Sequence, residues 1–134
     1  MKKLALIQLK LEKTDKYIFQ RRDGNAPTSP HLLGFFGGQM EPGELADEAA
    51  VRELKEETSL DVGSLALEHI VNSVLPSGLH NKTESIELHL FSATVPDVNF
   101  AVYEGVGSEA YSREDVLSRT DLAPTARYLL EQTY

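Results

Sequence analysis

Residues 37–60 read GGQMEPGELADEAAVRELKEETSL, and this stretch decides how the chain folds. It opens with a glycine pair, continues through a turn-forming Pro-Gly, and has helical periodicity over residues 44–58. At 100° per residue, Glu53, Glu56 and Glu57 fall within an arc of roughly 100° beside the apolar side chains that would face the core. The sequence therefore predicts a row of carboxylates along the border of a helix that packs on the core.

Such a row of acids requires a reason, because like charges three and four residues apart repel by roughly 0.2–0.5 kcal/mol per pair. One interpretation is a helix face that is simply solvated. The other is a site for a hard divalent cation, Mg²⁺ or Mn²⁺, because these ions favour carboxylate and carbonyl oxygens. The glycine pair and the arginine at fixed spacing from the acids favour the metal site.

The stretch resembles the Nudix box, the motif of a family of hydrolases. The family pattern is a glycine, five residues, a glutamate, seven residues and then R-E-U-x-E-E-x-G-U, where U is a bulky aliphatic residue. The matching positions are Gly38, Glu44, Arg52, Glu53, Leu54, Glu56, Glu57 and Leu60. The one departure is Ser59, where the family has glycine. A left-handed backbone there costs a non-glycine residue about 1 kcal/mol, so we expect Ser59→Gly to stabilise modestly and to leave activity intact.

The resemblance implies a mixed α+β domain in which a mixed β-sheet is sandwiched between helices. It also implies a Mg²⁺-dependent pyrophosphohydrolase, with Mn²⁺ as a possible substitute, that cleaves a nucleoside diphosphate linked to another moiety through attack of water on phosphorus. The metal ligands that it implies are the carbonyl of Gly37 and the carboxylates of Glu53, Glu56, Glu57 and Glu104. Catalytic roles are expected for Glu53, Arg52, Glu44 and Glu104.

Within this set, some roles stay open. Glu53 is the leading candidate for the general base and Glu104 is its competitor, with Glu109 a weaker candidate for the role of Glu104. Arg52 is expected to orient the helix carboxylates through ion pairs at a spacing of four residues, with Glu48 and Glu56. Glu44 either stabilises the helix N-terminus or supports the metals.

Composition narrows the choice of partners. The 134 residues are expected to form one domain, residues 1–134, with a single core. A net charge of −8, of which the box contributes −5, argues against binding to nucleic-acid phosphates. No stretch of the sequence is long and apolar enough to span a bilayer, so no membrane partner is predicted. The apolar residues of the N-terminus are interrupted by Gln8, Lys10 and Glu12, so we expect a strand there instead of a signal peptide. The absence of cysteine excludes thiolate chemistry, and the default expectation is a cytoplasmic protein.

The other elements follow from hydrophobic patterning. Strands are expected at residues 4–11, 17–22, 32–36, 65–75, 86–95 and 98–103. A capping sequence at residues 112–115 predicts a helical turn, and residues 123–132 predict a terminal helix. Residues 76–85 and 104–109 are expected to be loops.

The expected partner is a small nucleotide or other diphosphate, and dimerisation, which is common in the family, is possible. Arg21, Arg22 and Phe35 are the candidate substrate-binding residues, and a solvated charge pair is the alternative for the two arginines. The histidines have no shared metal-ligand spacing. Two other classes of function remain: a nucleotide-sensing module of the same fold without catalysis, and an acidic interaction domain whose helix only resembles the box.

Overall fold

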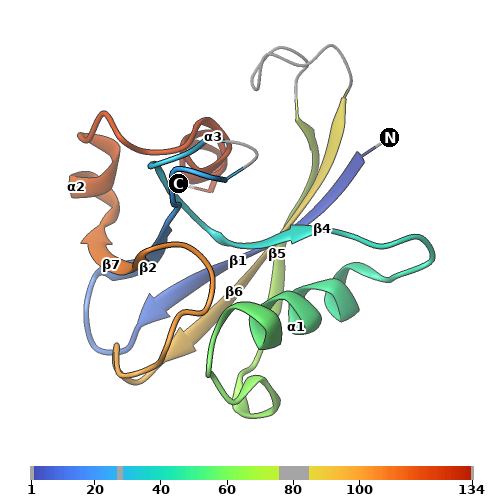
Figure 1. The fold of residues 1–134 in the computed structure, drawn as a ribbon, viewed down its shortest axis with the longest axis horizontal. Helices are drawn as coiled ribbons and strands as arrows, with labels where there is room; N and C mark the ends of the chain where they lie inside the picture. The colour runs from blue at the N-terminus through green and yellow to red at the C-terminus, as the bar shows by residue number, and fades with distance from the viewer. Residues whose placement is uncertain (1, 27–28, 76–84, 134) are drawn as a thin grey trace.

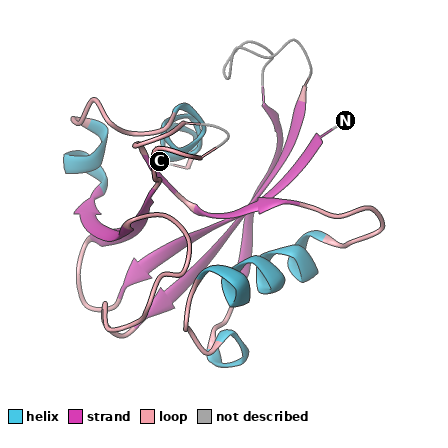
Figure 2. Ribbon diagram, viewed as in Figure 1, coloured by secondary structure: helices cyan, strands magenta, loops and turns pink. Residues whose placement is uncertain are grey.

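The fold is a mixed sheet with helices on both faces (Figure 2). The computed structural model describes residues 2–26, 29–75 and 85–133. Its strands are β1 (Lys2–Leu11), β2 (Lys16–Arg21), β3 (Leu33–Gly34), β4 (Phe36–Gln39), β5 (Glu68–Leu75), β6 (Ile86–Val95) and β7 (Gly107–Ser112). Its helices are α1 (Ala46–Glu57), the short 3₁₀ helix η1 (Val62–Ser64), α2 (Arg113–Leu117) and α3 (Pro124–Gln132). The sheet order is β3-β2-β1-β6-β5, with β4 paired to β1 and β7 paired to β2.

The central strand β1 divides one of its edges between two partners. On the other edge it pairs in parallel with β6 along its whole length. On the divided edge, its residues 4–7 pair with β4 and its residues 9–10 pair with β2, both antiparallel. Because β3 pairs with the end of β2 and β4 pairs with β1, this part of the chain changes its pairing partner at Phe35, between the two strands. The sheet therefore forks at this residue (Figure 1).

Two hydrophobic clusters hold the helices to opposite faces of the sheet. Along β6, Leu88 and Leu90 belong to the cluster that contains Leu129 of α3, whereas Phe91 belongs to the cluster that contains Leu54 of α1. Successive strand residues point to opposite faces, so one strand supplies both clusters. Burying each large side chain contributes roughly 1.5–3 kcal/mol. The predicted mixed sheet between helices is confirmed.

The helices begin at residues that satisfy free backbone N–H groups. In α1, Glu48 accepts a hydrogen bond from the Leu45 amide at 2.9 Å. In α2, Ser112 accepts from the Asp115 amide at 3.1 Å, as the capping sequence predicts. In α3, Pro124 occupies the first turn. Of the helices in the described ranges, none has the length and apolar character needed to cross a bilayer.

The structure corrects the expected elements in three places. The glycine pair, predicted to form a turn, lies inside β4 and pairs with Ala5 and Leu6. Residues 98–103, predicted as a strand, make only an isolated bridge between Val102 and Thr58. Residues 104–109, predicted as a loop, include the start of β7, because this segment pairs with β2. The predicted loop at 76–85 lies outside the described residues except for its last residue.

Candidate active site

The glycine pair in β4 separates two halves of the candidate site. Gly37 has a φ of +122°, and a Cβ atom there would lie 2.2 Å from the carbonyl oxygen of Ala5, so only glycine fits. Its amide donates a hydrogen bond of 2.7 Å to Glu57. At Gly38, a Cβ atom would lie 2.9 Å from a carboxylate oxygen of Glu53. The two glycines therefore bring the β4 backbone against two acids of α1.

Burial shifts the proton affinity of both acids. Glu57 is only 2% exposed, and desolvation raises the pKa of its carboxyl to about 9. The hydrogen bond from the Gly37 amide acts in the opposite direction, because it stabilises the ionised carboxylate. A hydrogen bond from the Glu57 carboxyl to the Glu104 carboxylate raises this pKa further. Desolvation also raises the pKa of Glu53, whose side chain is 12% exposed. Glu53, Glu57 and Glu104 therefore form one electrostatically coupled group, drawn from α1 and the segment before β7.

Arg52 connects the other acids of the helix. Its guanidinium donates two hydrogen bonds to Glu44, at 2.7 and 2.9 Å, and these bonds lower the pKa of Glu44 to about 2. It also lies 3.1 Å from Glu53 and 3.4 Å from Glu56. The ion pair that the sequence predicts between Arg52 and Glu56 is thus present, and Arg52 contacts Glu53 as well.

The expected Arg52–Glu48 pair is replaced by the helix cap, because Glu48 binds the Leu45 amide. Glu44 binds the amide of Glu41 at 2.9 Å in addition to Arg52. Glu44 therefore holds the guanidinium of Arg52 in place and does not cap α1. Glu48 performs the capping role that the sequence left open for Glu44.

The donor atoms fit a hard cation, although the side chains do not enclose one as they stand. In the described part of the chain, no three histidine, aspartate or glutamate side chains converge closely enough to coordinate a metal ion. Glu56, with its side chain 54% exposed, turns toward Arg52. The carboxylate oxygens of Glu53, Glu57 and Glu104 are nevertheless ligands of the kind that Mg²⁺ and Mn²⁺ prefer. Because Glu57 favours its neutral form, a cation and a proton would compete for the same oxygens.

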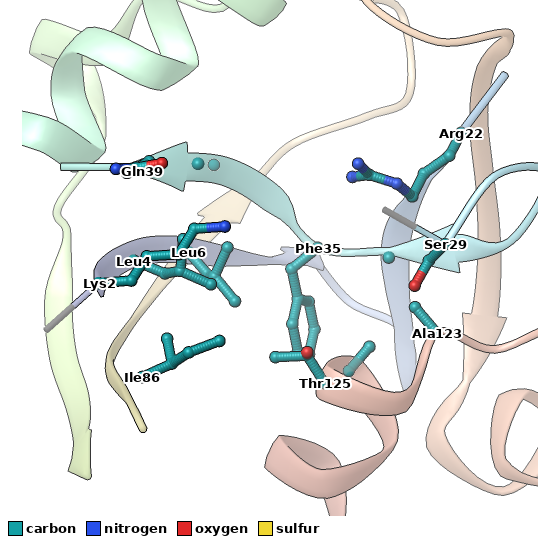
Figure 3. A pocket seen from close by; sticks show the side chains of 14 residues that line it. Lys2, Leu4, Leu6, Arg22, Ser29, Phe35, Gln39, Ile86, Ala123 and Thr125 are labelled. Carbon is teal, nitrogen blue, oxygen red and sulfur yellow. The ribbon is translucent and has the colours of Figure 1, made fainter. Parts of the chain in front are cut away.

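A cavity of about 370 Å³ lies on the other side of β4 (Figure 3). Its walls come from β1, β4, the start of β6 and α3, and Gly37 and Gly38 both line it. Apolar side chains of Leu4, Leu6 and Ile86 gather on one side of it, and Phe35 and Thr125 lie on the other. The backbone of Gly37 and Gly38 therefore lies against both this cavity and two acids of α1.

The candidate substrate residues divide between this cavity and a structural network. Arg22 and Phe35 line the cavity, and the Phe35 ring stacks on Phe19 at 5.7 Å. Arg21 does not line it. Its guanidinium binds Glu109 at 2.7 and 2.9 Å and Asp121 at 3.0 Å, which ties β2 to β7 and to the segment before α3. Glu109 is thus part of this network, and it also accepts a hydrogen bond of 2.6 Å from the Tyr111 hydroxyl.

Ser59 is not strained as expected. Its φ is not positive, and the helix ends at Thr58 in an extended conformation. The Ser59 hydroxyl instead accepts a hydrogen bond of 2.7 Å from the amide of Ala101. The expected stabilisation by Ser59→Gly is therefore wrong, because glycine would relieve no strain and would remove this bond.

Sequence reasoning did not identify the cavity residues Lys2, Gln39 and Thr125. Lys2 and Gln39 are the end residues of ordinary strands, and Thr125 is in the first turn of α3 among the residues that the helix buries. No local pattern marks them, since their only common property is that the fork of the sheet brings them together. Sequence reasoning also missed Gln20, which donates to the Glu104 carbonyl at 3.0 Å.

Comparisons with known proteins address the family and the fold. The family model described as the NUDIX domain matches residues 2–133. No curated protein matches the sequence. Among solved structures, the MutT protein from Methanosarcina mazei is 20% identical, with 98% of this chain and 91% of that chain covered and a TM-score of 0.79.

Two further structures are similar to this chain. The dihydroneopterin triphosphate pyrophosphohydrolase of E. coli is 22% identical, with 97% of this chain and 92% of that chain covered and a TM-score of 0.74. The NUDIX domain of Shewanella oneidensis NrtR, complexed with ADP ribose, is 19% identical, with 97% and 84% covered and a TM-score of 0.75. At these identities the likeness shows a shared fold.

Proposed function

Since the chain belongs to the NUDIX family, which hydrolyses diphosphate bonds, we propose that it is a Mg²⁺-dependent pyrophosphohydrolase. The proposed substrate is a nucleoside diphosphate linked to another group, of the nucleoside triphosphate or nucleotide-sugar type. One observation carries the proposal: the carboxylates of Glu53, which is partly buried, and Glu57, which is buried, lie against the two glycines of β4 that also line a cavity of about 370 Å³.

The metal would be held by the carboxylates of Glu53, Glu56, Glu57 and Glu104 and by the carbonyl oxygen of Gly37. Bound there, Mg²⁺ supplies positive charge that neutralises the diphosphate oxygens and favours attack on phosphorus. The role of Arg52 is to keep Glu53 and Glu56 on the side of α1 where they can act, because it contacts both. Glu44 holds Arg52 through a two-pronged ion pair.

The reaction requires a group that takes a proton from the attacking water. Glu53 is suited to this role because its partly buried carboxylate has a raised pKa and therefore a raised proton affinity. As the water oxygen bonds to phosphorus, the bond from phosphorus to the leaving phosphate oxygen breaks, and the water proton passes to the carboxylate. Glu104 is the competing base, since it belongs to the same coupled group.

The cavity would hold the part of the substrate beyond the phosphates. Apolar walls with a few polar groups are typical of sites for small organic ligands. Arg22 is the lining residue best suited to a phosphate, and Phe35 provides an aromatic wall. Arg21 is better explained as a structural residue, since it binds two carboxylates.

The test is a screen for substrate hydrolysis in the presence of Mg²⁺, in which the two phosphate-containing products are separated by ion-exchange chromatography. Its substrates are nucleoside triphosphates, dinucleoside polyphosphates, nucleotide sugars, ADP-ribose and dihydroneopterin triphosphate, the last two because similar folds bind or hydrolyse them. Turnover that is lost in Glu57→Gln supports the proposal. Nucleotide binding without turnover of any substrate would indicate the sensing module instead, and turnover undiminished in Glu57→Gln would contradict the metal site.

A further inference from the structure

The segment that carries Glu104 is fastened to the end of α1. We call residues 98–106, which belong to the connection between β6 and β7, the Glu104 loop. Its Ala101 exchanges two hydrogen bonds with Ser59: the Ser59 amide donates to the Ala101 carbonyl at 3.0 Å, and the Ala101 amide donates to the Ser59 hydroxyl at 2.7 Å. The amide of Tyr103 then donates to the carbonyl of Glu57 at 2.6 Å. Figure 1 shows the loop, in orange, passing the C-terminal end of α1.

The other end of the loop is fastened to β2. The side-chain amide of Gln20, which is 4% exposed, donates to the carbonyl of Glu104 at 3.0 Å. The amide of Val106 donates to the carbonyl of Arg21 at 2.9 Å. Gly105 has a φ of +79°, and a Cβ atom there would lie 2.4 Å from the same carbonyl oxygen. Glu104 is thus held between two attachment points, and the loop passes too close to β2 for a larger residue after it.

Two of these attachments depend on side chains, one from Ser59 and one from Gln20. Backbone bonds alone would hold the loop whatever residue stood at position 59. The hydroxyl of Ser59 adds a bond that the glycine of the family pattern lacks. This bond lies close to Glu104, because Ala101 is only three residues before it. Between the two, the Tyr103 amide donates to the backbone carbonyl of Glu57, and the carboxyl of the same Glu57 interacts with Glu104.

We propose that Ser59 is a positioning residue that, with Gln20, sets the Glu104 carboxylate against Glu57. This inference rests on the proposed function, because it assigns Ser59 to the same reaction. Small displacements of a reacting group reduce rates sharply, and a misplacement of about 1 Å can reduce a rate by about 100-fold. Loss of one of the loop's attachments is a milder change, so we expect a decrease in kcat of roughly 3- to 10-fold. Removal of the Ser59 hydroxyl, by Ser59→Gly as well as by Ser59→Ala, is therefore not expected to leave activity intact, in contrast to the expectation from the sequence.

The experiment measures turnover of Ser59→Ala, Ser59→Thr and Glu104→Gln, and of the double variant Ser59→Ala/Glu104→Gln. Ser59→Ala should lower kcat with little change in KM, and Ser59→Thr, which keeps the hydroxyl, should restore it. In the Glu104→Gln background, Ser59→Ala should have no further effect, since the residue acts through Glu104. A full additional loss in the double variant would overturn the inference.

A second readout does not depend on activity. Amide hydrogen exchange, measured by NMR on the metal-free protein, should accelerate at Ala101 and Tyr103 in Ser59→Ala but not in Ser59→Thr. Unchanged exchange at both amides would overturn the inference.

Ser112→Ala is the matched control, because it also removes a bond from an amide to a serine hydroxyl but at the start of α2. It should leave kcat and these two amides unchanged. A wild-type protein that hydrolyses no substrate would refute the proposed function. An active wild type that Glu57→Gln inactivates, with kcat unaltered in Ser59→Ala, would refute this inference alone.

Discussion

Replacing Glu57 by glutamine should stabilise the metal-free protein while it removes activity. Glutamine has the shape of the protonated carboxyl, so its carbonyl oxygen can still accept from the Gly37 amide and its amide can still donate to Glu104. Glutamine has no proton to lose. The variant therefore isolates the free energy that is needed to ionise Glu57 in its buried position.

The magnitude follows from the pH. The folded-state pKa of Glu57 is raised above the value of 4.5 for an exposed glutamate, so the wild type is destabilised as pH rises above 4.5 and until it passes the raised pKa. Each pH unit in that window corresponds to about 1.4 kcal/mol. Between pH 5 and pH 7, the wild type should therefore lose about 2–3 kcal/mol relative to Glu57→Gln. For a domain of this size that corresponds to a difference in Tm of about 10 °C.

The assay is thermal unfolding of both proteins in EDTA at pH 5, 6 and 7, followed by the same series with excess Mg²⁺. In EDTA the advantage of Glu57→Gln should be small at pH 5 and should grow toward pH 7. Mg²⁺ should raise the Tm of the wild type at pH 7 and have little effect on the variant. A difference in Tm that is independent of pH would refute the reasoning, because it would mean that Glu57 ionises in the folded protein as easily as in the unfolded chain.

Three other substitutions test the surrounding contacts. Gly38→Ala should lower kcat at least roughly tenfold with the fold retained by circular dichroism, because the new methyl group would displace the carboxylate of Glu53. Arg52→Lys should lower kcat by about tenfold with a smaller change in KM, measured by steady-state kinetics, because lysine cannot make the two parallel bonds of the guanidinium. Arg21→Gln should lower the free energy of unfolding by about 1–2 kcal/mol at pH 7 in urea titrations, with kcat unchanged. The ion pair with Arg21 lowers the pKa of Glu109 in the folded protein. The stability that this pair contributes is therefore complete above the ordinary glutamate pKa and is lost as pH falls through the lowered pKa of Glu109. The difference in free energy of unfolding between wild type and Arg21→Gln should disappear in that acidic range.

The sequence predicted the parts of the site that lie within one helix. A repeat of 3.6 residues places Glu53, Glu56 and Glu57 on one side of α1 without knowledge of the rest of the chain. The arginine contact to Glu56 follows from the same spacing. Local geometry also predicted the cap at Ser112 and the proline in the first turn of α3.

Features that depend on contacts between distant segments could not be predicted in this way. The glycine pair was predicted as a turn because glycine is rare in strands, yet the structure needs it in β4, where the backbone lies between β1 and α1. Arg21 and Arg22 are equivalent in the sequence, and only the alternation of side chains along a strand separates the residue in the ion-pair network from the one beside the cavity. The contact between Glu57 and Glu104 spans 47 positions, and only the family resemblance indicated it.

The fork of the sheet at Phe35 also affects how the protein can be re-engineered. Residues that shape the cavity, such as Leu6, Ala126 and Thr125, come from β1 and α3, whereas the acids belong to α1 and the Glu104 loop. Their side chains extend on opposite sides of a strand that presents only glycine at the junction. A library of substitutions at positions 6, 125 and 126 would therefore sample new substrate shapes while leaving every carboxylate in place. In such a scaffold, recognition and chemistry can be changed one at a time.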